Sequence, residues 1–247
     1  MKLLPLILLF WLADIAHGAD LPTQFELEYT LKGTIGRGKA SQTFSIEQRE
    51  GVRHYQIKSE VRASGLLSLV KSGSIVLHST GTIHQGNLQP VLFTDQRGGK
   101  PVREVAFDWQ QQRIVYRRKG REMIERLPNN TQDKLSFMYH FMFAGVPQTA
   151  FSIYETDHRR LQSARYAVSE EILATPIGKF ASIVLTRQPT PDDPRPKKLW
   201  LAKDYFLLPL RIISMESSGI KVDQLISSIR YNPDGHMQRL VTHAADR

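Results

Sequence analysis

The stretch FELEYTL, residues 25–31, alternates apolar and polar side chains at every position. Phe25, Leu27, Tyr29 and Leu31 would lie on one face of an extended chain, because successive side chains of a β-strand point to opposite faces. The same alternation returns at residues 55–61. A period of two over such stretches indicates half-buried strands of an antiparallel sheet.

Segments of this kind follow one another about every ten residues, separated by glycine-containing turn signals. The turn signals include Glu50-Gly51, Gly86-Asn87, Gly98-Gly99 and Lys119-Gly120. The predicted strands are 25–31, 44–46, 55–61, 75–79, 91–93, 102–108, 113–118, 121–127, 151–154, 164–172, 180–187, 199–202, 210–216 and 222–231. We therefore expect a mainly β fold, either a large curved antiparallel sheet or a half-open β-barrel.

One segment has helical instead of strand spacing, with the apolar residues Leu135, Phe137, Met138, Phe141 and Met142. Asn130 or Thr131 would cap its first turn, in which Asp133 is also favourable. Gly145 and Pro147 would end it. Because this short helix is strongly apolar, we expect it to cover one mouth of the curved sheet.

The N-terminus has the pattern of a secretory signal peptide. Lys2 precedes an uncharged stretch at residues 3–13, and the small residues Ala16 and Gly18 follow. Cleavage near Gly18 would leave residues 19–247 as a single β-rich domain in the periplasm, while a buried N-terminal helix or an uncleaved anchor is the alternative. No apolar run reaches the roughly 18 residues of a spanning helix, so we expect no transmembrane span after signal removal.

Two segments should lie outside the regular sheet. Residues 188–196 hold four prolines and two aspartates, which predicts an exposed loop or hairpin tip between strands of similar type. Residues 234–247 are polar, and we expect this C-terminal tail to fray.

Composition restricts the chemistry of this 247-residue chain. It contains no cysteine, which excludes disulfides, thiolate metal sites, cysteine nucleophiles and a lipidated N-terminal cysteine. Its formal net charge of +9 is informative about binding partners and not about the fold. Outside the cytoplasm, phospholipid headgroups, lipopolysaccharide phosphates and acidic glycans are the available polyanions, and we expect no nucleic acid partner.

The familiar catalytic motifs are missing from the sequence. It has no H-E-x-x-H and no G-x-S-x-G, and the G-x-x-G-x-G at residues 33–38 lies between predicted strands, so it indicates a break or bulge in the strand and not a phosphate-binding loop. His78 and His84 make a weak metal pair, and His158 is expected to be solvated. We assign no catalytic, cofactor-binding or metal-binding residues and expect no cofactor.

Two groups of residues are candidates for binding. The basic cluster around the turn at 119–120 offers Arg117, Arg118 and Arg121 as contacts for an anion or a partner; the alternative is a solvated hairpin tip whose charges block edge aggregation. Strongly apolar segments between strands are candidates to line a binding site for an apolar ligand. The alternative is that these segments fill the core. The candidates for that lining are Leu66, Leu67, Leu69, Phe137 and Phe141.

An ordered set of short motifs resembles a bacterial family of unknown function, numbered 3108, found in Gram-negative envelopes. The motifs are Leu88-Gln89-Pro90 before Phe93, Phe107-Asp108-Trp109, Asp133-Lys134-Leu135-Ser136, Thr175-Pro176-Ile177-Gly178-Lys179-Phe180, Leu199-Trp200-Leu201-Ala202 and Leu208-Pro209-Leu210-Arg211. The resemblance covers about residues 25–231 and implies an exported, periplasmic, β-rich protein. It transfers no catalytic residues. A further likeness to lipoprotein-carrier folds concerns architecture alone.

The sequence favours a non-catalytic periplasmic protein. It would bind an apolar or amphipathic, lipid-like molecule of the envelope, or an envelope partner protein. One alternative is a structural or assembly factor of the envelope without a small ligand. The other is an envelope glycan or lipid hydrolase, because carboxylates from distant strands can converge in a folded cleft.

Overall fold

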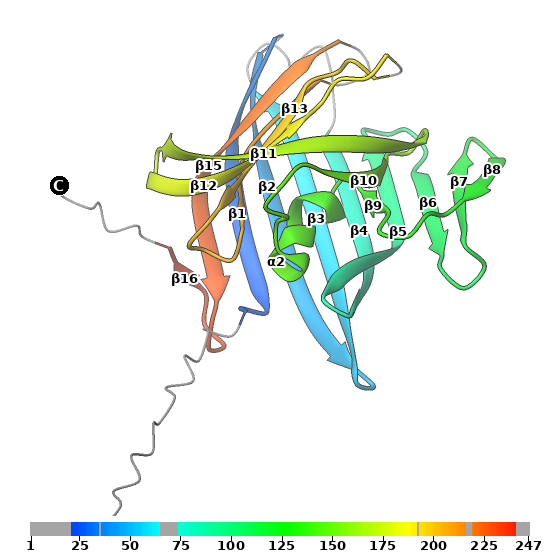
Figure 1. Cartoon of the computed structure of the whole chain (residues 1–247), viewed down its shortest axis with the longest axis horizontal. Coiled ribbons are helices and arrows are strands. Elements are labelled where there is room, and N and C mark those ends of the chain that lie inside the picture. The colour runs from blue at the N-terminus through cyan, green and yellow to red at the C-terminus, as the bar shows by residue number, and fades with distance from the viewer. Residues whose placement is uncertain (1–20, 35, 65–73, 192, 216–218, 241–247) are drawn as a thin grey trace, which may run out of the picture.

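The computed structural model describes residues 21–240 except 35, 65–73, 192 and 216–218 (Figure 1). In this part of the chain, sixteen strands form one sheet and a single short helix packs against it. The strands are β1 (Gln24–Gly33), β2 (Gly36–Arg49), β3 (Val52–Ser64), β4 (Ile75–His84), β5 (Asn87–Arg97), β6 (Arg103–Asp108), β7 (Arg113–Arg118), β8 (Arg121–Arg126), β9 (Gln132–Asp133), β10 (Phe151–Thr156), β11 (Leu161–Thr175), β12 (Gly178–Arg187), β13 (Lys197–Ala202), β14 (Pro209–Met215), β15 (Lys221–Asn232) and β16 (Gln238–Arg239), and the helix is α2 (Ser136–Ala144).

The sheet is a meander built from two arms. Strands β1 to β8 lie side by side in chain order and form the N-terminal arm, and β15 back to β9 form the C-terminal arm. The arms join where β1 pairs with β15, and all pairs are antiparallel except β9 with β10. Figure 1 shows the sheet curving around α2, with β8 at one free edge. The predicted mainly β fold with a large, curved, open sheet is confirmed.

The alternation of residues 25–31 places a row of apolar side chains on the concave face. Phe25, Leu27 and Tyr29 are buried, whereas Glu28 on the opposite face is exposed. The Phe25 ring stacks on that of Tyr231 from β15, with 6.5 Å between the ring centroids. Each such buried side chain contributes about 1.5–3 kcal/mol through removal of apolar surface from water, so this row holds the two arms together.

Helix α2 starts differently from the prediction. Its N-cap residue is Leu135, and the Asp133 carboxylate just before it accepts hydrogen bonds from the backbone N–H groups of Leu135 at 2.8 Å and Ser136 at 2.9 Å. The expected caps Asn130 and Thr131 lie too far upstream, and the Thr131 hydroxyl donates to a local carbonyl instead. Burial raises the pKa of Asp133, while the hydrogen bonds that it accepts oppose this shift. The helix ends before Gly145, as predicted.

The helix fills the concave side of the sheet and contacts both arms. Tyr139 stacks on Phe44 of β2 at 5.2 Å between ring centroids, and its hydroxyl donates to Gln42. On the other side, Phe137 lies 5.1 Å from the ring of Tyr166 in β11. Aromatic contacts of this kind add to the burial of apolar surface. The side chains of the helix therefore link two arms that backbone hydrogen bonds do not join at this place.

Part of the C-terminal tail is ordered against the sheet, contrary to the expectation that it frays from residue 234. Strand β16 pairs with β15, with Gln238 opposite Tyr231. The next residue after β16, Leu240, is buried, and its backbone N–H donates to the carbonyl of Ile229. Burial of Leu240 and the pairing of β16 with β15 explain the difference.

Candidate functional site

A cavity of about 460 Å³ lies inside the curved sheet, between the two arms and beside α2. Its lining comes from both arms and from the helix. One part is apolar, with Leu31, Val61, Leu77, Phe93, Leu135 and Met138 among its residues. A volume of this size suits one small-molecule ligand.

The rest of the lining is strongly cationic. Eight arginine or lysine side chains line the cavity, against only the three carboxylates of Asp95, Glu155 and Asp157. The whole chain carries 33 basic and 24 acidic side chains, so more than half of its excess positive charge is gathered here. A cleft lined by charges of one sign concentrates ligands of the opposite sign.

Lys197 is a largely enclosed cation at this site. Its ammonium group pairs with the Glu155 carboxylate and lies 3.9 Å from the centroid of the Phe137 ring. Glu155 also accepts a hydrogen bond from the Tyr166 hydroxyl. Burial lowers the pKa of Lys197; Glu155 opposes the shift, whereas the charge of Arg187 adds to it. This cation therefore lies in a poorly solvated, aromatic environment.

The Asp193 carboxylate pairs with three guanidinium groups at the same end of the cavity. Its carboxylate lies 2.6 Å from Arg195, 2.9 Å from Arg187 and 3.3 Å from Arg160. Burial alone would raise the pKa of Asp193, but the hydrogen bonds from Arg195 and the charge of Arg187 bring it well below its usual range. The prediction that loop 188–196 is exposed is wrong at Asp193, which is 3% exposed. Its ion pairs with the arginines hold this part of the loop against the sheet.

His158 joins the two arms across the open side of the sheet. It was expected to be solvated, but it is 6% exposed and its Nδ1 lies 3.0 Å from the buried carboxylate of Asp95. Its Nε2 lies 2.8 Å from Arg103 and 3.1 Å from Arg159. Because arginine has no acceptor, Nε2 must accept these bonds, and Nδ1 therefore carries the proton that is donated to Asp95.

Arg97 completes this cluster on β5, with its Nε 2.8 Å from the Asp95 carboxylate. Burial would raise the pKa of Asp95, but the hydrogen bonds from His158 and Arg97 bring it well below its usual range. A second polar contact nearby joins the Tyr116 hydroxyl of β7 to Thr156 of β10 at 2.8 Å. Side chains thus hold together the arms that the backbone ladder leaves open.

Two amide oxygens in the lining have no hydrogen-bond partner among the described residues. They are the Oε1 atoms of Gln162 on β11 and Gln224 on β15, and both are enclosed. A buried polar atom without a partner costs free energy, and native proteins rarely leave one so. A polar group of a bound molecule would satisfy them.

The residues proposed from sequence lie elsewhere or cannot be placed. Leu66, Leu67 and Leu69 fall outside the described residues. Phe137 and Phe141 are buried between the helix and the C-terminal arm, and neither lines the cavity; their neighbours Leu135 and Met138 do.

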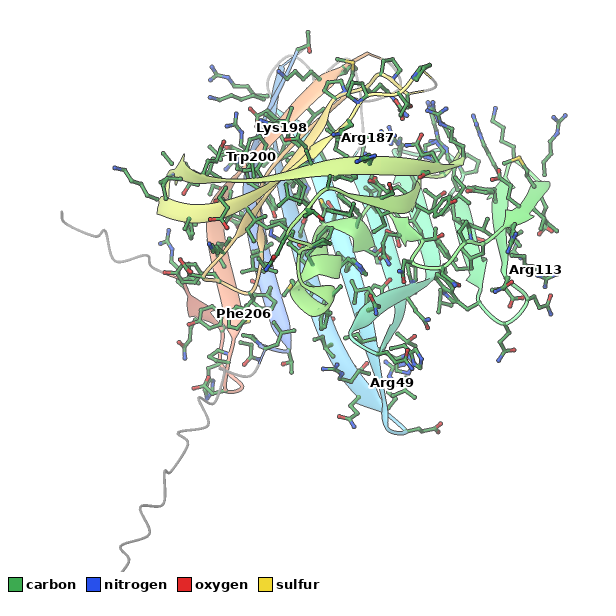
Figure 2. All side chains as sticks on the ribbon, in the orientation of Figure 1. Arg49, Arg113, Arg187, Lys198, Trp200 and Phe206 are labelled. Atoms are coloured by element: carbon green, nitrogen blue, oxygen red, sulfur yellow. The ribbon has the colours of Figure 1, made fainter. Side chains whose placement is uncertain are left out.

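The basic hairpin of β7 and β8 is also separate from the cavity lining. Arg117, Arg118 and Arg121 are exposed on it, and Arg117 pairs with Glu122 across the hairpin at 2.7 Å. Figure 2 shows Arg113, from the same hairpin, at the far edge of the sheet from Arg187. The sequence cluster and the cavity are therefore two different basic regions.

The cavity residues follow a pattern in the sequence that none of the predicted sites uses. Asp95 is two residues after the buried Phe93, and Lys197 is two residues before the buried Leu199, so each charge lies on the inward face of its strand. Arg187 follows the buried Leu185 in the same way. A charge in phase with core residues indicates a paired or functional group, because isolated charges are costly to bury.

Within the described residues, α2 is too short and not apolar enough over its length to cross a membrane. In that same part of the chain, no three histidine or carboxylate side chains come together as a group that could hold a metal ion.

Comparisons with known proteins were made for the whole chain. A search of curated proteins found no match. Among solved structures, the crystal structure of a beta-barrel-like protein of the domain of unknown function DUF1849 from Brucella abortus is similar, with 8% sequence identity and a TM-score of 0.48. That match covers 84% of this chain and 97% of the other. The family model described as "Protein of unknown function (DUF3108)" matches residues 24–224. The chain therefore belongs to the DUF3108 family.

Proposed function

We propose that this protein is exported to the periplasm, where it binds one amphipathic, lipid-like molecule in the cavity without catalysing a reaction. The observation that carries the proposal is the contrast within one cavity of about 460 Å³. Apolar side chains such as Leu31, Leu77 and Phe93 line one part, and an excess of cations lines the other. A molecule with a hydrocarbon part and a polar end matches both parts at once.

The carboxylates in the lining favour binding over catalysis. A general acid at neutral pH needs a raised pKa, as hydrolases achieve by burial without a counter-charge. The pKa of Asp95 is lowered instead, by His158 and Arg97. Glu155 is occupied by the Lys197 ammonium and the Tyr166 hydroxyl. These pairings occupy two of the three carboxylates in the described lining, and the third, Asp157, accepts hydrogen bonds from the backbone N–H groups of Arg159 and Arg160.

Export rests on the N-terminal pattern, with the basic Lys2, the apolar stretch and the small residues before residue 19. The absence of cysteine suits an oxidising compartment, because no thiol can pair wrongly there. The first cavity residue in the chain is Leu31, so removal of residues 1–18 would leave the described lining whole.

Binding of an uncharged apolar probe tests this proposal. N-phenyl-1-naphthylamine, which fluoresces in apolar surroundings, should bind the protein saturably and with one site. Val61→Trp should fill part of the apolar region and weaken binding about tenfold or more, because overpacked cavities exclude ligands. Val91→Trp, at an exposed position outside the lining, is the matched control. Absence of saturable binding, or equal binding by V61W and V91W, would overturn the proposal.

A second candidate function, contact with an envelope partner protein, is favoured by the β7–β8 hairpin. Strand β8 is a free edge, and Ile124 on it is 58% exposed, beside the exposed Met123. Free edges with apolar side chains are sites of strand pairing between proteins. A photo-crosslinking residue at position 124 should trap one specific envelope protein in intact cells, whereas one at Ile172, which is 67% exposed, should not. Identical crosslinks from both positions would exclude this candidate.

A further inference from the structure

We infer that the polar end of the bound molecule is a phosphate group, held by Arg187 and Lys197 on the wall of the cavity formed by β11, β12 and β13. The inference rests on the proposed function, and it adds the chemical class of the headgroup. Both side chains line the cavity. They come from adjacent strands, so the sheet itself fixes their spacing.

The strand register places these two cations side by side. Arg187 lies opposite Tyr166 of β11, and Thr186 lies opposite Lys198 of β13. Arg187 and Lys197 occupy the next position, just beyond the last paired residues, and they lie close enough for the charge of Arg187 to act on Lys197. Side chains directly opposite each other in an antiparallel pair lie on the same face of the sheet, and for this pair that face is the cavity wall.

The charge on this wall matches a phosphate better than a carboxylate. Four cationic side chains surround the position, namely Lys134, Arg187, Arg195 and Lys197. In the cavity lining as a whole, eight arginine and lysine side chains stand against the carboxylates of Asp95, Glu155 and Asp157. The lining therefore carries five more basic than acidic side chains. A phosphate monoester carries about −1.5 to −2 at neutral pH, whereas a fatty acid carries one negative charge.

The donor geometry also suits a phosphate. Arg187 uses Nη1 for the ion pair with Asp193, and a guanidinium group carries five N–H donors in a planar fork. The arginine side chain is 6% exposed, so an oxyanion bound there would be shielded from solvent. Arginine binds phosphate through two parallel hydrogen bonds, and lysine adds a compact positive charge. The two residues together offer what a phosphate group requires.

Gln162 supplies a second, independent indication of a polar group at this wall. It lies opposite Glu155 in the β10–β11 pair, and its enclosed Oε1 atom has no partner among the described residues. A protonated phosphate oxygen can donate to this atom. If the amide is turned by 180°, its N–H groups can instead donate to an unprotonated oxygen. Either arrangement gives the Gln162 amide a hydrogen-bond partner, and a buried amide without one costs free energy.

Two probes with the same twelve-carbon chain test the inference by calorimetric titration below their micelle concentrations. Dodecyl phosphate should bind about tenfold tighter than the uncharged dodecyl maltoside, as expected for shielded, charge-assisted hydrogen bonds. The preference should decrease with added salt, since part of it is electrostatic. Equal affinities for the two probes would overturn the inference and leave the proposed apolar binding intact. Binding of neither probe would overturn both.

Variants of adjacent residues assign the effect to this wall. Lys197→Met should weaken dodecyl phosphate about tenfold and leave dodecyl maltoside unchanged. Lys198→Met removes the same charge one residue away, where the ammonium group lies over the Trp200 ring, and should change neither affinity. Figure 2 shows Lys198 and Trp200 together. Equal effects of K197M and K198M would contradict the assignment.

Folding of the variants and the source of the phosphate are controlled separately. Lys197→Met combined with Glu155→Gln removes both charges of the pair, so no buried carboxylate is left alone. Arg187→Gln leaves Asp193 with Arg195 and Arg160, and Arg113→Gln on the β7–β8 hairpin is its matched control. Inorganic phosphate should bind far more weakly than dodecyl phosphate. Equal binding would identify free phosphate as the ligand and contradict a lipid headgroup.

Discussion

Nδ1 of His158 donates a hydrogen bond to the buried carboxylate of Asp95, over 3.0 Å, and so connects the segment after β10 to strand β5. These two residues belong to opposite arms of the sheet, which share no backbone ladder at this place. The cavity between the arms therefore depends on polar side chains for its closure, and the two residues line it themselves.

Loss of the imidazole should destabilise the protein. His158→Ala leaves Asp95 with Arg97 but removes the link between the arms, and we expect a loss of about 1–3 kcal/mol in the free energy of unfolding. Urea unfolding followed by circular dichroism measures it. His84→Ala, at an exposed position on β4, is the control and should change stability little. An effect of H158A no larger than that of H84A would show that the hydrogen bond between His158 and Asp95 does not stabilise the fold.

Acid should weaken the fold through Asp95 and Asp193. The pKa of each is lowered in the folded protein, so their contribution to stability is fully present above the ordinary pKa of 3.8. That contribution is lost as the pH falls from this value through the folded-state pKa, because protonation removes the ion pairs.

Thermal unfolding between pH 7 and pH 2 checks this expectation. Asp193→Asn should flatten the acid limb of the stability curve, since one titrating group is removed. Asp234→Asn, at an exposed position, should leave the curve unchanged. An acid limb of the same steepness in wild type and D193N would contradict the role of this carboxylate.

Gly81 should be irreplaceable in β4 for a steric reason. A Cβ atom at this position would lie 2.1 Å from the carbonyl oxygen of Gln89 and 2.8 Å from a ring carbon of Tyr55. The nearest contact is backbone, at the irregular pairing of β4 with β5, so it cannot move aside easily. Gly81→Ala should cost about 1–3 kcal/mol or more of unfolding free energy, as overpacking does.

The matched control for this prediction is Gly99→Ala. A Cβ atom there would meet nothing within 4 Å. Urea unfolding of both variants gives the comparison, and we expect G99A to remain close to wild type. Similar midpoints for G81A and G99A would show that β5 can shift to accept the extra carbon.

The sequence predicts the sheet best where a strand carries its own period of two, as β1 does. Phe25 to Leu31 is apolar on the face that becomes the core, and no long-range information is needed to see it. The end of the helix is equally local, since Gly145 terminates it. The start of the helix is less local. Its N-cap is Leu135, whose N–H donates to the Asp133 carboxylate, while the hydroxyl of the expected cap Thr131 donates to another carbonyl.

The cavity could not be predicted in the same way because its residues are distant in the chain. Asp95 and His158 meet only when the segment after β10 lies beside β5, and Arg187 meets Asp193 only when the proline-rich loop folds back. The visible cluster of arginines at 113–126 lies on a solvated hairpin instead. Charges in phase with core residues, such as Lys197 before Leu199, were the available signal.

Native mass spectrometry of the wild-type protein, purified from the periplasm under gentle conditions, tests the central claim most directly. We predict the mass of the chain from residue 19 plus one bound amphipathic molecule, which releases a phosphate-containing fragment on activation. V61W, with part of the cavity filled, should give the bare mass, and V91W should retain the bound molecule. A bare mass for the wild-type protein would contradict the account.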